Sequence, residues 1–89
     1  MHSLRRGAAE AIEAIAHGDE SESKVVGRKI EDIELPKGAA IVTLVRDNRV
    51  IIGHHDTVIE SDDHVIIFLT DRRKIESLEK LFEVGVSFV

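Results

Sequence analysis

The stretch AAIVTLVRDNRVIIGHHDTVIESDDHVIIFLT, from Ala39 to Thr70, decides the fold. Its β-branched and apolar runs predict three strands, over Ala40–Arg46, Arg49–Gly53 and His64–Thr70. Asp47 and Asn48 tolerate positive φ, so they favour a type I′ turn between the first two strands. Side chains alternate between the faces of a strand, and here both sets are largely apolar. We therefore expect both faces of the sheet to be covered, one of them by a second copy of the chain.

Two helical patterns flank these strands. Apolar residues spaced at i, i+4 and i+7 predict a short helix over Val26–Leu35, which Pro36 ends. A second helix is predicted over Asp71–Phe82, where Asp71 can cap the first turn. The segment Ala11–Ala16 is open at this point, because its composition favours a helix while its alternation fits a strand. The order β(or α)–α–β–β–β–α describes a small α+β domain with a central β-hairpin and two short helices.

The same patterns predict which side chains form the core. The expected core residues are Ile41, Val45, Ile51, Ile66, Phe68, Ile75 and Leu78. If Phe68 is buried, its replacement by Ala should cost about 3–5 kcal/mol. In the loop before the last core strand, Val58 and Ile59 should return one side chain to the core. The apolar tail, residues 84–89, is predicted to be an extra strand or a strap across an interface.

Composition limits the classes of function. The chain has 89 residues, with 12 Lys and Arg against 17 Asp and Glu, a net charge of −5 that argues against a nucleic-acid partner. It has no Cys, hence no disulfide or thiolate metal site. No apolar run approaches the roughly 20 residues that cross a bilayer. The start resembles a cut end rather than a signal peptide. The basic residues 72–74 fit a solvated patch or a contact for an anion or acidic partner.

One cluster, His54, His55 and Asp56, invites a catalytic or metal-binding interpretation. A catalytic His needs a nucleophile and an orienting partner, and neither a Cys nor a Ser in a nucleophile elbow is present. We therefore expect no catalytic residue and no enzymatic activity. Together with His64, the cluster could bind zinc or nickel, although adjacent histidines on an extended chain point in opposite directions. A metal ion bridging two copies is the form of this hypothesis that the spacing allows.

Three segments carry a resemblance to a known family. KVVGRKIEDIELPKG (Lys24–Gly38) has a Gly after two apolar residues and ends in Leu-Pro-x-Gly before an apolar strand. DTVIESDDHVI (Asp56–Ile66) and the closing helix follow the same family pattern. The chain resembles the TrkA-C domain, the C-terminal domain of potassium-conductance regulators (RCK proteins), over nearly its whole length. LRRGAAEAIEAIAHG (Leu4–Gly18) is similar to one potassium-uptake regulator within that family.

The resemblance implies a structure and a role. Ala11–Ala16 would be the first strand, residues 1–10 a linker from a preceding domain, and residues 11–89 the regulatory domain. The full protein would be a cytoplasmic subunit, peripheral at the inner membrane face, that forms a ring beneath a membrane potassium transporter. The domain would be non-catalytic and would pair with another copy.

The resemblance also bears on ligands. Nucleotide would bind a preceding Rossmann domain, since no G-x-G-x-x-G motif occurs here, and we expect no cofactor in this domain. The alternative function is a ligand-sensing module, with a cyclic dinucleotide or a divalent metal at the dimer interface. Base stacking would need aromatic residues, and the chain has Phe68, Phe82 and Phe88.

Overall fold

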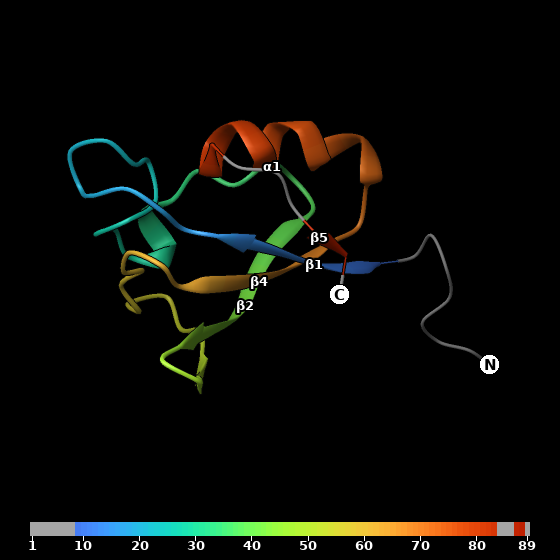
Figure 1. The fold of residues 1–89 in the computed structure, drawn as a ribbon. Coiled ribbons are helices and arrows are strands. Elements are labelled where there is room, and N and C mark those ends of the chain that lie inside the picture. Colours follow the sequence, from blue (N-terminus) through green and yellow to red (C-terminus); the bar gives the residue numbers. More distant parts are fainter. Residues whose placement is uncertain (1–8, 84–86, 89) are drawn as a thin grey trace.

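A computed structural model describes residues 9–83 and the backbone of residues 87–88, which build a five-stranded antiparallel sheet and one α-helix (Figure 1). The elements are β1 (Glu10–Ile15), the 3-10 turn η1 (Ile30–Asp32), β2 (Ala39–Arg46), β3 (Arg49–Ile52), β4 (His64–Leu69), the 3-10 turn η2 (Arg72–Lys74), α1 (Ile75–Phe82) and β5 (Ser87–Phe88). The strand order is β3-β2-β4-β1-β5, so β4 is central. This arrangement confirms the predicted α+β class.

The strand predictions agree with the structure to within one residue at each end. The turn residues Asp47 and Asn48 have φ angles of 52° and 64°, as a type I′ hairpin requires. β1 is a strand, against its local helix propensity, because it pairs with β4 along its whole length. At the other end of the sequence, the predicted extra strand is confirmed for Ser87–Phe88, which pair with β1. The other residues of that tail lie outside the described part of the chain.

The core lies on one face of the sheet, which we call the inner face. α1 runs over this face (Figure 1). β2 contains a bulge. Ile41 pairs with Ile67 and Thr43 pairs with Ile66 of β4, so Val42 is an extra residue without a partner in this register. The bulge interrupts alternation, so Ile41 and Leu44 are both buried. The buried core consists of Ile12, Ala14, Ala16, Val25, Val26, Ile33, Ile41, Leu44, Ile59, Val65, Ile67, Leu69, Leu78 and Phe82.

The predicted core was partly wrong. Ile41 and Leu78 are buried as expected, and Ile51 and Ile75 pack against the core while half-buried. Phe68 is 48% exposed and lies on the opposite face. Val45 and Ile66 are half-buried outside the core. The prediction failed because β4 is apolar on both faces, so its alternation separates two sets of residues without telling which set is covered.

The predicted helix over Val26–Leu35 is reduced to the single turn η1. Gly27 has a φ of 84°, a left-handed conformation that an α-helix does not contain. Backbone groups of this segment bond the loop before β4 instead: Gly27 N–H donates to the Ile59 carbonyl at 2.7 Å, and Ile30 N–H donates to the Thr57 carbonyl at 2.9 Å. Tertiary hydrogen bonds therefore replace the helical ones, while the apolar side chains still reach the core. Ile59 is the loop side chain that returns to the core, as predicted.

The C-terminal helical segment forms as predicted. Asp71 accepts a hydrogen bond from the Arg73 backbone N–H at 3.0 Å, which caps the first turn. Leu78 and Phe82 bury the inward side of α1. Two of the three basic residues before α1 have carboxylate partners, since Arg73 bonds Asp71 and Arg72 Nε lies 3.0 Å from Glu10 Oε1. No helix in the described residues is long and apolar enough to cross a membrane.

Candidate functional site: the outer face of the sheet

The sheet face opposite α1 is here called the outer face, and no helix of the described residues lies over it (Figure 1). The strand registers bring its apolar side chains together from four neighbouring strands. They are Ala11, Ile15, Ala40, Val45, Val50, Ile52, Ile66 and Phe68. Four of them, Ile15, Val50, Ile52 and Phe68, are large and exposed. Soluble monomers rarely leave a contiguous apolar surface uncovered, so this face is the candidate interaction site.

Phe68 is the most prominent feature of the outer face. In the register of the sheet it lies between Ala11 on β1 and Ala40 on β2. Both neighbours are small, so the ring projects above the surrounding surface. Beside it is an almost wholly apolar hollow of about 90 Å³, lined by Ala9, Glu10, Ala11 and Phe68. A projecting ring and an adjacent apolar hollow on one face can be self-complementary about a two-fold axis.

A hydrogen-bonded pair, Glu13 with His64, lies among these apolar residues. The Glu13 Oε2 and His64 Nδ1 atoms are 3.0 Å apart, and both side chains are partly exposed. The two residues come from the adjacent strands β1 and β4. The Glu13 carboxylate is therefore hydrogen-bonded within the outer face rather than left bare.

The ion pair between Asp63 and Arg46 is structural. The Asp63 side chain is completely buried and accepts hydrogen bonds from Arg46 Nε at 2.8 Å and Nη2 at 2.7 Å. It also accepts from the Glu60 backbone N–H at 2.8 Å. The Asp63 hydrogen bond raises the pKa of the Arg46 guanidinium. This bidentate contact ties the loop before β4 to the end of β2.

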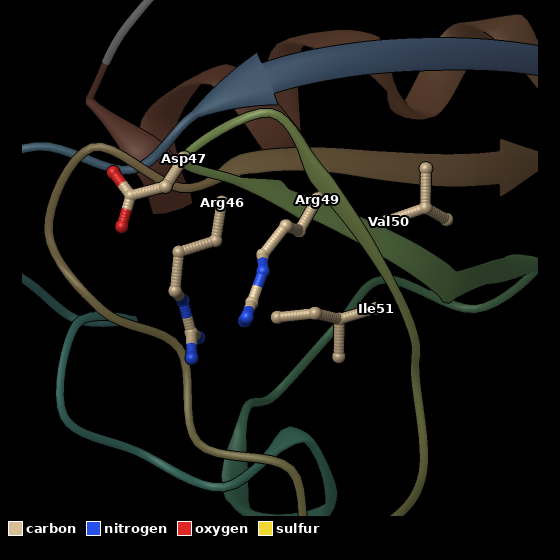
Figure 2. A pocket seen from close by; sticks show the side chains of 5 residues that line it. All are labelled: Arg46, Asp47, Arg49, Val50 and Ile51. Atoms are coloured by element: carbon tan, nitrogen blue, oxygen red, sulfur yellow. The ribbon is translucent and has the colours of Figure 1, made fainter.

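The hairpin end of the sheet contains an open hollow of about 550 Å³ (Figure 2). It is lined by Arg46, Asp47, Arg49, Val50 and Ile51. Figure 2 shows both guanidinium groups pointing the same way and the Asp47 carboxylate pointing away from them. Arg46 is engaged by Asp63, whereas Arg49 is exposed and makes no side-chain hydrogen bond or ion pair with the described residues. The hollow therefore offers one uncompensated cation.

The structure separates the residues that the sequence grouped as metal candidates. His54, His55 and Asp56 lie exposed on the loop between β3 and β4, while His64 begins β4 and bonds Glu13. His54 contributes its backbone N–H to the Thr57 hydroxyl at 3.0 Å. Among residues 9–83, no group of three or more His, Cys, Asp or Glu side chains is placed to hold a metal ion. Any metal site on these residues would need ligands from elsewhere.

Two features of the site were missed by sequence reasoning. Glu13 as the partner of His64 depends on the register of β1 against β4, which the sequence does not specify. No role in the site is predicted for Asp63 either, although it is the buried partner of Arg46. A signal for the latter was available, since an Arg that ends a core strand and an Asp that precedes another are suited to bond across a sheet.

Comparison with known proteins identifies the family. A family model described as the TrkA-C domain matches residues 19–83. The chain belongs to the TrkA-C domain family. Two proteins named "Trk system potassium uptake protein TrkA" are close relatives of this TrkA-C domain. That of Halomonas elongata is 61% identical over 88 residues, 99% of this chain and 19% of that protein. That of Vibrio alginolyticus is 58% identical over 89 residues, 100% of this chain and 19% of that protein.

The TrkA-C domain thus spans 19% of the length of these relatives. Among solved structures, the one titled "Structure of RCK domain with cda" resembles it with a TM-score of 0.63. The match covers 82% of this chain and 97% of that chain at 16% sequence identity. At this identity the likeness establishes the shared fold alone.

Proposed function

We propose that this domain is a non-catalytic regulatory and assembly module of a potassium uptake subunit, and that it pairs with a second copy through the outer face. The observation that carries the proposal is the open apolar face, on which Phe68 is 48% exposed. Large exposed aromatic residues within an apolar patch are typical anchors of protein interfaces. The potassium uptake role follows from the relatives named TrkA, which share this domain.

A second copy is the partner that best fits the chemistry of the outer face. The Glu13 carboxylate is already hydrogen-bonded to His64 within the face, and the exposed apolar side chains around it can pack against the same side chains of a second copy. Homodimers with two-fold symmetry are the commonest assemblies of soluble proteins. In the full protein, which we place in the cytoplasm at the inner membrane face, such pairs would hold the subunits of a ring in register. They would transmit movements of nucleotide-binding domains to the membrane transporter, with no cofactor bound in this domain.

The mass of the chain in solution tests the pairing. Sedimentation of the wild-type chain from micromolar to millimolar concentration should show a dimer that forms in the lower part of this range. Phe68→Asp should weaken that dimer at least about tenfold, because it places a charge within the apolar contact. Ser77→Asp is the matched control, since it adds the same charge on the exposed side of α1. A wild-type chain that remains monomeric throughout, or a Phe68→Asp dimer of unchanged affinity, contradicts the proposal.

A ligand-sensing role is the second candidate. The observation that favours it is the solved RCK domain of the same fold, whose title includes "with cda". In this chain, Arg49 would supply the cation for an anionic ligand such as a cyclic dinucleotide. Calorimetric titration with cyclic dinucleotides should then give saturable heat that Arg49→Ala removes.

A metal ion at the interface is tested by calorimetric titration of the chelator-treated protein with zinc and nickel. If such a site exists, His64→Ala should abolish the heat of metal binding.

A further inference from the structure

The free edge of the sheet at β3 presents unpaired backbone groups. β3 ends the strand order on one side. Arg46 and Arg49 flank the two-residue turn, so they form a hydrogen-bonded pair. Such pairs alternate with non-hydrogen-bonded ones along an antiparallel ladder, which places Val50 and Ile52 in the latter. Their N–H and C=O groups therefore point away from β2, and within the described residues no backbone or side-chain group bonds them.

The side chains at these two positions are also uncovered. Val50 is 68% exposed and Ile52 is 61% exposed. Both belong to the outer face, so the apolar surface of that face continues to the edge of the sheet. Natural edge strands are usually protected by Lys, Pro or a bulge, and β3 has none of these. Its one charged residue, Arg49, stands at the beginning of the strand.

We propose that β3 pairs with β3 of a second copy, antiparallel and about a two-fold axis at Ile51. This axis places Val50 opposite Ile52 of the second copy, and Ile52 opposite its Val50. Each of these symmetry-related pairs then exchanges both of its backbone hydrogen bonds. The result is one sheet continuous through both copies, with the two outer faces on the same side.

The sequence of β3 favours a second copy as the added strand. The two-fold axis brings apolar side chains together on the outer face, because Val50 and Ile52 each meet the other residue of the pair. Arg49 falls opposite Gly53 of the second copy, so the cation meets no like charge. The Asp47-Asn48 turn lies beyond this paired region and does not obstruct it.

This edge contact rests on the proposed function, because it is a second contact in addition to pairing through the outer face. A chain with one isologous contact stops at a dimer, whereas two different contacts allow a larger closed assembly such as a ring. A strand of four residues buries little surface. The edge contact should therefore form at higher concentration than the outer-face contact, or when the rest of the subunit holds copies together.

Two variants separate the contacts. Val50→Pro removes the edge N–H at a position where β2 does not use it, so the fold should tolerate the change. Val50→Thr is the matched control, since it keeps both the N–H and the β-propensity. By sedimentation at high concentration, the wild-type chain and Val50→Thr should exceed the mass of a dimer, and Val50→Pro should stop at a dimer. A dimer that Val50→Pro abolishes and Phe68→Asp preserves would support the edge and overturn the outer face.

Amide hydrogen exchange gives a readout on the wild-type chain itself. The amides of Val50 and Ile52 should exchange more slowly as concentration rises, while the amide of Asn48 in the turn should not change. Exchange of both β3 amides at the rate of exposed amides at every concentration would overturn the proposal. An unchanged mass distribution in a folded Val50→Pro variant would do the same, and neither result would bear on pairing through the outer face.

Discussion

The two faces of the sheet have similar apolar content and opposite surroundings. Ile67 and Phe68 are consecutive in β4, yet the first is fully buried and the second is 48% exposed. On the inner face, α1 and the loop that contains Ile59 cover the strands. On the outer face, no described residue of the chain does so. Alternation therefore creates two apolar surfaces, and the connecting segments determine which one becomes the core of the monomer.

The polar side-chain pairs of the two faces differ in the same way. Asp63 is buried, and its contact with Arg46 ties the loop before β4 to the end of β2. Glu13 and His64 are both partly exposed on the outer face. Buried pairs are costly to break, while exposed pairs contribute little to stability. Substitutions that disturb the inner face should thus affect folding, and those on the outer face should affect association.

Asp63→Asn is expected to have one of the two largest effects. The substitution keeps the shape but leaves Arg46 without its buried carboxylate, which should cost about 3 kcal/mol, toward the low end for a broken buried pair because Arg46 is partly exposed. For a domain of this size that is a large share of the total stability. Urea unfolding measures the loss. Asp62→Asn is the control, since Asp62 is exposed at a φ of 72° that Asn also tolerates, and equal losses in the two variants would contradict the assignment.

Truncation of one apolar side chain on each face compares the faces directly. Leu78→Ala should cost about 2–5 kcal/mol, because it leaves a cavity beneath α1. Phe68→Ala should cost less than about 1 kcal/mol of monomer stability, because the ring is half exposed and lies outside the core cluster. Thermal unfolding at low concentration, where the chain is monomeric, gives both values. A larger loss for Phe68→Ala than for Leu78→Ala would reverse the assignment of the faces.

The sequence predicted the strands and the turn because their signals are local. Asp47-Asn48 needs no tertiary information to favour its turn, and the apolar runs define β2 and β4 without a partner. The position of Phe68 could not be predicted in this way, because it depends on which face α1 covers. The helix expected over Val26–Leu35 failed for a similar reason, since its N–H groups bond a loop distant in sequence. The site is likewise a product of register, which brings Glu13 to His64.

The smallest effect concerns the cap of the helical segment that covers the inner face. The Arg73 side chain, followed by its backbone N–H, holds the pKa of Asp71 below 3.8. A depressed folded-state pKa adds stability above the unfolded-state pKa, and that contribution is lost as the pH falls through the folded-state value.

Asp71→Asn keeps a capping oxygen and removes the titration. The variant should therefore lose less stability than the wild-type chain on acidification below pH 3.8, by a small margin because the carboxylate is exposed. Urea midpoints measured along this acid range provide the comparison, and molar salt should narrow the difference. If the urea midpoints of the two chains fall in parallel as the pH is lowered, the contact between Arg73 and Asp71 contributes nothing to the stability of the helical segment.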